Sequence, residues 1–343
     1  MSSAASTQMF REAAQAPEVV RALLDANATR VADLAERLHR APPRAVVTCA
    51  RGSSDHAATF ARYLIETRLG LLTSSAAPSV SSVYETAPDL AGTVMLAISQ
   101  SGASPDLLAV VSRARAAGAR IVALVNAEGS ALAQLADDLL PLHAGIERSV
   151  AATKSYIGSL AAIVQLVAEW SADAALGAAL QRAPQQLTRA WQLDWSVAVT
   201  RLTPVNNLYV VARGLGLGVA QEAALKLKET CGLHAEAVSA AELRHGPMAL
   251  VRAGFPLLLF TQNDESRAGV TELAAELAAQ GADVLLAGTR VVGTTELPTE
   301  AAHPVIEPLL FAQSFYRMAA ALALARGLDP DAPPHLRKVT ETL

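Results

Sequence analysis

Three ionisable residues in this chain are spaced so that a single helix would present them together. Glu222, Lys226 and Glu229 stand at positions i, i+4 and i+7, so in a helix their side chains project from the same side. This spacing predicts a base and a cation on one helix face. An exposed face with a stabilising Glu–Lys pair has the same spacing, so the pattern alone leaves both interpretations open.

Two serine-rich segments each follow a short apolar run. Arg51-Gly-Ser-Ser54 comes after AVVTCA, and Ser99-Gln-Ser-Gly-Ala-Ser104 comes after VMLAIS. Hydroxyls and backbone N–H groups at a helix N-terminus suit a phosphate, because the helix dipole and the unpaired donors favour negative charge. Serine is also a common helix N-cap, so each segment alone fits a capped turn equally well.

The elements that would position these residues alternate between strand and helix. Short runs rich in Val, Ile and Leu are followed by Ala-rich helical stretches, the rhythm of βαβ units. Continuous apolar strands indicate parallel sheets that are buried on both faces. We therefore expect an α/β fold with parallel sheets flanked by helices, and serine loops at the carboxyl edge, where such sheets bind ligands.

The strand–helix pattern occurs twice in the sequence, as an internal repeat. Arg51-Gly52 reappears as Arg213-Gly214, and the strand end at Ser99 reappears at Thr261, both 162 positions later. We call the stretch 45–126 copy one and the stretch 207–288 copy two; chance likeness between two α/β patterns is the alternative. Copy two has Asp264 and Glu265 where copy one has small residues, so only copy one is expected to accept an anion.

This repeat gives the expected domain organisation, with a boundary near residues 184–203. The parts are an N-terminal helical arm (1–30), a phosphate-binding subdomain (31–185), a subdomain with the catalytic helix (200–328) and a C-terminal lid tail (329–343).

Composition narrows the class of partner. The chain has 343 residues, 52% of them hydrophobic and 17% charged, with a formal net charge of -4. A large folded core is expected. The negative net charge does not indicate binding to nucleic acid or to a membrane surface. No signal peptide or long apolar run is recognised, so the expectation is a cytoplasmic protein with a small-molecule partner. Cys49 and Cys231 are too few for a disulfide framework and are interpreted as buried apolar residues.

Further segments carry a family resemblance along almost the whole chain. ARGSSDHAATFARYLIE, AISQSGASPDLL, SVAATKSY, ALKLKE, ELRHGP and the tail HLRKVTETL occur in this order. Together they resemble the sugar isomerase (SIS) family: the isomerase half of glucosamine-6-phosphate synthase and, most closely, SIS-type glucosamine-6-phosphate deaminase. The resemblance implies two tandem SIS subdomains, each a parallel sheet between helices.

The resemblance also implies a role for each candidate residue. Glu229 would carry a proton between C1 and C2, Lys226 would position the sugar, and His245 would assist ring opening from the neighbouring subunit of a homodimer. Aldose–ketose proton transfer needs one base and neither metal nor cofactor, and histidine titrates in the range that hemiacetal opening requires. Lys338 resembles a lysine that forms a Schiff base with a keto sugar. The implied phosphate and sugar contacts are Gly52, Ser53, Ser54, Ser99, Gln100, Ser101, Ser104, Val150 and Ala152.

Departures and alternatives remain. Ala152 stands where the synthase has a serine, the tail reads RKVTE, and His245 could be a structural turn histidine. No stretch is left for a glutaminase domain, so the expected reaction is deamination of glucosamine-6-phosphate to fructose-6-phosphate and ammonia. A fructosamine-phosphate deglycase, another aldose–ketose isomerase and a non-catalytic phosphosugar sensor are the alternatives.

Overall fold

The computed structural model describes residues 4–86, 88–336 and 338. They fold as two compact units, each built around one parallel sheet. The sheet-one unit comprises residues 18–147, 154–181 and Lys338, and the sheet-two unit comprises residues 4–17, 148–153 and 182–336. The predicted arm, subdomains and tail stay a prediction.

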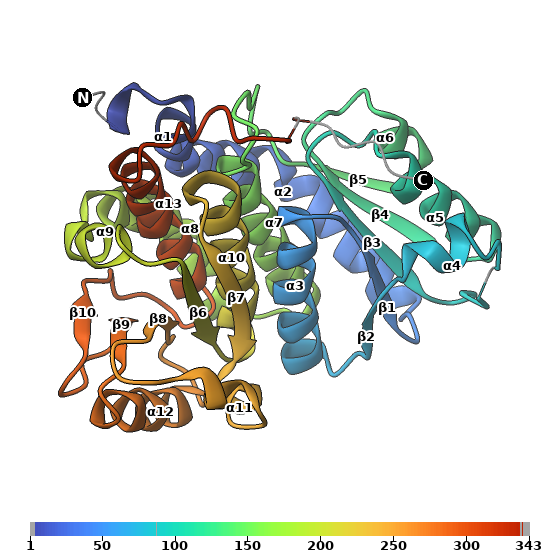
Figure 1. Cartoon of the computed structure of the whole chain (residues 1–343). Helices are drawn as coiled ribbons and strands as arrows, with labels where there is room; N and C mark the ends of the chain where they lie inside the picture. The colour runs from blue at the N-terminus through green and yellow to red at the C-terminus, as the bar shows by residue number, and fades with distance from the viewer. Residues whose placement is uncertain (1–3, 87, 337, 339–343) are drawn as a thin grey trace. The chain divides into compact units, whose positions relative to one another are not determined.

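The first sheet has five parallel strands in the order β2-β1-β3-β4-β5 (Figure 1). The sequence changes direction of winding between β1 and β3, so the loops after these two strands lie at the switch point of the sheet. Every residue of β3 is buried, as expected for a strand covered on both faces. The strands are β1 (Val46–Cys49), β2 (Thr73–Ser75), β3 (Val94–Ser99), β4 (Arg120–Val125) and β5 (Asp138–Pro141).

Helices follow the strands of this unit. α5 begins with Pro105 at its first position, where the fixed φ of proline suits a helix start. α3 ends at Leu69 and is capped by Gly70, whose left-handed φ of 64° favours glycine. The helices are α2 (Ala16–Arg40), α3 (Ser53–Leu69), α4 (Pro78–Ser82), α5 (Pro105–Ala116), α6 (Ala131–Leu135) and α7 (Lys154–Trp170); α8 (Ala174–Gln192) runs on into the other unit.

The second sheet has five parallel strands in the order β10-β9-β8-β6-β7. In this unit α10, the helix that follows strand β6, packs against both β7 and α13. The strands are β6 (Asn207–Ala212), β7 (His234–Ser239), β8 (Pro256–Phe260), β9 (Asp283–Ala287) and β10 (Thr295–Leu297). The helices are α1 (Gln8–Ala13), α9 (Ser196–Leu202), α10 (Leu217–Cys231), α11 (Ala240–Leu243), α12 (Arg267–Ala279) and α13 (Glu307–Ala325), with short 3₁₀ turns η1 (Ala4–Ser6), η2 (Gly214–Gly216) and η3 (Pro247–Leu250).

The two sheets repeat one topology. When the strands are numbered within each unit, both sheets have the same order, and β1 corresponds to β6, β2 to β7 and β3 to β8. The offset of 162 positions that the sequence shows between Arg51 and Arg213 also relates the first residues of β3 and β8, and those of α5 and α12. The predicted α/β fold with two tandem parallel sheets is confirmed.

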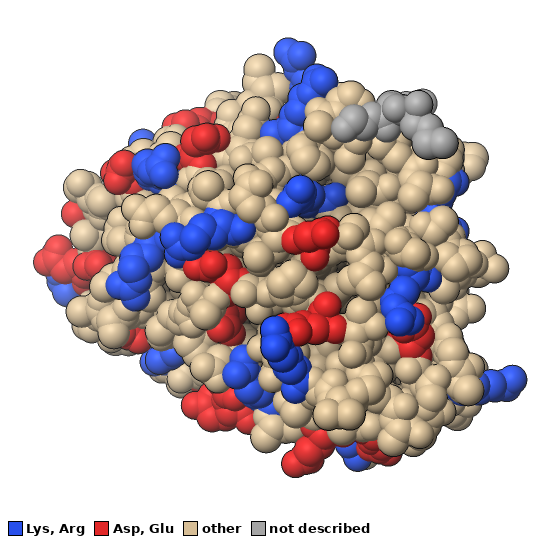
Figure 2. Space-filling model, turned by 90° about the vertical axis from the view of Figure 1, so that its left-hand side faces the viewer, with Lys and Arg blue, Asp and Glu red and all other residues tan. Residues whose placement is uncertain are grey.

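Two further expectations concern the surface and the core. On the face drawn in Figure 2, basic and acidic residues are interspersed, and neither sign gathers into a broad patch. Within the described part of the chain, α13 is long and apolar enough to cross a membrane, but 78% of its apolar window is buried. A buried core helix has this composition, and α13 packs on α10.

Candidate functional site

The first serine loop follows β1 and opens α3. Gly52 has a φ of 54° in this loop, a left-handed conformation that glycine adopts at little cost. The backbone N–H of Ser54 donates to the Arg51 carbonyl at 3.1 Å. Ser53 and Ser54, the first two residues of α3, are both half-buried. The loop therefore presents two hydroxyl side chains at a helix N-terminus.

The second serine loop follows β3 and opens α5. Ser99 is buried, and its Oγ accepts a hydrogen bond from the Gly102 backbone N–H at 2.9 Å. Gly102 has a φ of 62°, and a Cβ at this position would lie 2.2 Å from Ser130 Oγ, so a larger residue does not fit. Ser104 is the N-cap of α5 but makes no side-chain capping bond. Gln100, Ser101 and Ser104 are each partly exposed.

The sheet brings the two serine loops to one edge. β1 and β3 pair in parallel, with Cys49 opposite Ala97 near their carboxyl ends. Arg51 in the first loop donates from Nε to Asp106 Oδ2 at 2.7 Å, and Asp106 belongs to the first turn of α5. The two loops are thus adjacent and joined by an ion pair.

Burial raises the pKa of one carboxyl near this edge and of both cysteine thiols. Burial raises the pKa of the Asp55 carboxyl, an effect that His56 and Arg51 partly oppose. Burial also raises the pKa of the Cys49 thiol to about 12. Cys231 in α10 is buried too, and its pKa is raised to about 11. Both thiols therefore remain protonated at neutral pH, and the prediction that they are buried apolar residues is confirmed.

A cluster of charged residues lies on one face of α10. Lys226 Nζ is 3.6 Å from Glu222 Oε1 and in direct contact with Glu229 Oε2. Tyr316 of α13 donates its hydroxyl hydrogen to Glu222 Oε1 at 2.9 Å. The predicted common face is therefore present, and it is a packed face rather than an exposed one.

The three side chains of this cluster differ in their exposure to solvent. The side chains of Glu222 and Lys226 are 1% exposed, whereas that of Glu229 is 20% exposed. A buried ammonium needs counter-charges, because its desolvation is costly, and the two glutamates supply them. Glu229 is therefore the more exposed carboxylate of this cluster.

His245 lies in an exposed turn between α11 and η3. Its backbone N–H donates to the Glu242 carbonyl at 2.9 Å, and the following Gly246 has a φ of 138°. Within the described residues the His245 side chain has no hydrogen bond or ion pair, so the fold leaves the imidazole available to solvent. The structure does not join it to the α10 cluster by any described contact.

Lys338 contacts a buried carboxylate of its own unit. Its Nζ lies 3.2 Å from Oε2 of Glu147, a side chain that is fully buried. The same carboxylate accepts from the Ser155 hydroxyl at 2.6 Å and from the Ser155 backbone N–H at 3.2 Å. This contact ties the C-terminal lysine to the start of α7.

The segment 148–153, which contains Val150 and Ala152, belongs to the sheet-two unit. Both residues are half-buried. The backbone N–H groups of Arg148 and Ser149 donate to the carboxylate of Glu12, at 2.6 and 3.0 Å. Glu12 is 1% exposed, so a buried carboxylate from α1 fixes this segment.

Sequence reasoning missed three partners of the candidate residues. Tyr316, Glu147 and Asp106 lie 94, 191 and 55 positions from the residues they hold, and no local spacing links them. One signal was present: a phenol inside the apolar helix 307–325 needs a hydrogen-bond partner when it is buried. In residues 4–86, 88–336 and 338 no group of three or more His, Cys, Asp or Glu side chains is arranged to hold a metal ion.

Comparison with known proteins gives related chains for both units. The model of the family described as the SIS domain matches residues 41–169 and 201–291. The crystal structure of a candidate phosphosugar isomerase from Silicibacter pomeroyi is 43% identical, with a TM-score of 0.91, and covers 95% of this chain and 100% of that one.

Curated relatives are longer. Glutamine–fructose-6-phosphate aminotransferase (isomerizing) of Aeropyrum pernix is 34% identical over 84% of this chain and 49% of its own length. The chain spans about half the length of the curated relatives it matches. Glucosamine-6-phosphate deaminase from Thermotoga maritima is 22% identical, with a TM-score of 0.77 over 98% of this chain and 100% of that chain, which shows a shared fold.

Proposed function

We propose, on the premise that this chain belongs to the SIS family, that it is a glucosamine-6-phosphate deaminase. The observation that carries the proposal is the α10 cluster, in which Lys226 is buried between Glu222 and the more exposed Glu229. Such a face has a base that a substrate can reach and a cation that fixes that base.

The phosphate of the substrate is proposed to bind the two serine loops. Their hydroxyls and the N-termini of α3 and α5 lie at the carboxyl edge of the first sheet, the arrangement that favours a bound anion. The contact residues in this proposal are Gly52, Ser53, Ser54, Ser99, Gln100, Ser101 and Ser104, with sugar contacts from Val150 and Ala152.

The proposed chemistry is a proton transfer followed by hydrolysis. After the ring opens to the aldehyde, Glu229 takes the proton from C2 and returns it to C1, while one proton moves from the C2 amino nitrogen to the C1 oxygen, so the C1 carbonyl becomes an alcohol and C2 becomes an imine. Water adds to C2 and ammonia leaves, which gives fructose-6-phosphate. One carboxylate serves as base and then as acid. Lys226 is buried beside it and holds it in place, and the family resemblance also assigns Lys226 to positioning the sugar.

Two further groups complete the proposal. His245 is exposed, and we assign it the ring-opening step, with the imidazole supplied by the neighbouring subunit of a cytoplasmic homodimer. Lys338 is assigned to the open-chain sugar. A Schiff base at Lys338 requires its ammonium to leave Glu147 and lose a proton, so the Glu147 contact describes the state before substrate binds.

The test is the release of ammonia and fructose-6-phosphate from glucosamine-6-phosphate by the purified chain. Equal amounts of both products are expected. Glu229→Gln should lower the rate of release at least about a hundredfold, and Lys228→Gln, an exposed change on the same helix, should leave it normal. Conversion of fructosamine phosphates alone would replace the deaminase with a deglycase. Binding of the sugar without any conversion would indicate a sensor, and either result overturns the proposal.

A further inference from the structure

Arg51 and Asp106 form an ion pair between the two serine loops. Nε and Nη2 of Arg51 lie 2.7 and 2.6 Å from the same oxygen, Asp106 Oδ2. The other oxygen, Oδ1, accepts from the Leu107 backbone N–H at 2.8 Å. The pair uses one edge of a planar guanidinium that has five N–H donors, so further donors are available to a ligand.

The two partners differ in exposure. The Asp106 side chain is 1% exposed, whereas the Arg51 side chain is 50% exposed. A carboxylate beside an expected phosphate would repel it, and a buried carboxylate is costly unless it is paired. Asp106 is both buried and at the phosphate edge, so its contribution to that edge comes through the arginine that it holds.

The pair is confined to copy one. In copy two, the residue equivalent to Arg51 is Arg213, but the residue equivalent to Asp106 is Ala268, again 162 positions later. Copy two therefore keeps the arginine without the carboxylate that would fix it. The anchored arginine occurs only in the copy whose loops have serine hydroxyls and no acidic residues.

We propose that Arg51, held by Asp106, is a phosphate-positioning residue that fixes the spacing of the two serine loops and directs its remaining N–H groups to the bound phosphate. This inference rests on the proposed function, because it assigns a role within the same phosphate site. Charge-assisted hydrogen bonds from arginine to phosphate are strong and directional. The substrate class that this selects is a phosphate monoester rather than a neutral sugar.

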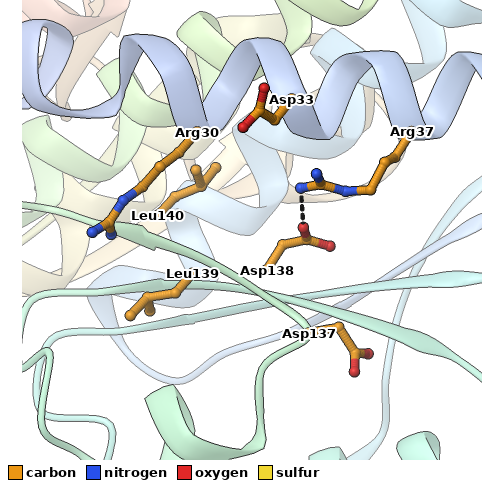
Figure 3. Close-up of a pocket in the computed structure, with 7 residues that line it drawn as sticks. All are labelled: Arg30, Asp33, Arg37, Asp137, Asp138, Leu139 and Leu140. Atoms are coloured by element: carbon orange, nitrogen blue, oxygen red, sulfur yellow. Dashed lines mark hydrogen bonds and ion pairs between the residues drawn. The ribbon is translucent and has the colours of Figure 1, made fainter.

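A matched ion pair lies at the opposite edge of the same sheet. Arg120 Nε donates to Asp138 Oδ2 at 2.6 Å, with side-chain exposures of 38% and 6%. Arg120 begins β4 and Asp138 begins β5, so this pair belongs to the amino edge. Asp138 lines an open pocket of about 330 Å³, and Figure 3 shows Arg37 of α2 directed at it. The Arg120 pair is therefore a control for the loss of one arginine–aspartate salt bridge away from the loops, with Arg37 left as the partner of Asp138.

The experiment measures binding by calorimetry and turnover by ammonia release, using the full chain. The variants are Arg51→Gln, Arg51→Lys, Asp106→Asn and, as the control, Arg120→Gln. Arg51→Gln is expected to raise both the Kd and the KM for glucosamine-6-phosphate by about tenfold or more, with kcat changed less than about threefold. Inhibition by inorganic phosphate should weaken by the same factor, and Arg120→Gln should leave all of these values unchanged.

The conservative variants separate positioning from folding. Arg51→Lys keeps the charge but loses the planar fork, so its Kd should fall between those of the wild type and Arg51→Gln. Asp106→Asn should raise the Kd although it removes a negative charge. Arg51→Gln and Arg51→Lys with wild-type affinity for inorganic phosphate would overturn the inference, as would an equal loss of affinity for phosphate-free glucosamine.

The outcomes for the wild type distinguish this inference from the function on which it rests. If the wild type binds glucosamine-6-phosphate but releases no ammonia, the deaminase fails and the Kd series still decides the role of Arg51. If the wild type binds neither glucosamine-6-phosphate nor inorganic phosphate, both proposals fail.

Discussion

The two copies of the fold differ in what occupies the loop at their switch point. In copy one, the Gly102 N–H is held by the neutral hydroxyl of Ser99 at 2.9 Å. In copy two, the Ser266 N–H donates to the Asp264 carboxylate at 2.9 Å, and the Asn263 N–H donates at 2.6 Å to the carboxylate of Glu307, which belongs to α13 and not to the copy. The loop of copy two is therefore bonded to carboxylates, whereas the loop of copy one presents hydroxyls.

The helices that follow the first strand of each copy, α3 and α10, also differ in their charged groups. α3 of copy one begins with two serines and has Asp55 in its first turn. α10 of copy two instead buries an ammonium between two carboxylates in its later turns. The proposed function thus gives one topology two tasks: copy one would hold the phosphate, and copy two would transfer the proton. Function belongs to the groups placed on the fold and not to the fold itself.

The largest effect is expected from removing the proton carrier of copy two. Glu229→Gln should lower kcat about 10²- to 10⁴-fold, the range for loss of a general base, while the Kd for glucosamine-6-phosphate stays within about tenfold. The amide keeps the size of the side chain, and Lys226 retains Glu222 as its counter-charge. The measurement is ammonia release at saturating sugar, with calorimetric binding beside it. Loss of binding with unchanged kcat would mean that Glu229 binds the sugar and is not the catalytic base.

The next effect concerns the packing that supports the α10 cluster. Tyr316→Phe removes the hydroxyl that donates to Glu222 and should cost about 1–3 kcal/mol of unfolding free energy, because a buried carboxylate loses a donor. Urea unfolding measures this cost. The matched change Tyr63→Phe, on a half-buried tyrosine of α3, should cost less. Equal costs would mean that Glu222 does not depend on Tyr316.

A third change gives copy one a feature of copy two. Ala103 is exposed in the second serine loop, and its equivalent in copy two is Glu265. Ala103→Glu places a carboxylate beside the proposed phosphate and should weaken phosphosugar binding about tenfold, whereas Ala103→Gln should change it little. The measurement is the Kd of both variants at low and high salt, since screening should reduce the difference. Similar Kd values for both variants at low salt would contradict an anion site in copy one.

The sequence predicts most of this comparison because its signals are local. Strand ends, serine loops and the i, i+4, i+7 face of α10 can each be read within about ten residues, and the repeat relates the copies. Partners that lie far apart in sequence cannot be found in this way. Tyr316 reaches Glu222 from another helix, and Asp106 reaches Arg51 from another strand–helix turn. Their placement depends on packing between elements, which no short spacing records.

The smallest effect expected is a pH dependence of stability in copy one. Burial raises the pKa of Asp55 above 3.8 in the folded state, so the folded protein holds this proton more tightly than the unfolded chain does. The contribution is present below pH 3.8 and is lost as the pH rises through the folded-state pKa. Asp55→Asn removes that titration, so the variant should gain unfolding free energy relative to the wild type across this window. Urea unfolding from pH 3 to pH 7 tests the sign.

The opposite result would be a variant that loses stability relative to the wild type as the pH rises. It would mean that the fold prefers the ionised carboxylate, which His56, Arg51 and the α3 N-terminus favour. Copy one would then tolerate a fixed negative charge beside its serine loops, and the electrostatic distinction between the two copies would weaken.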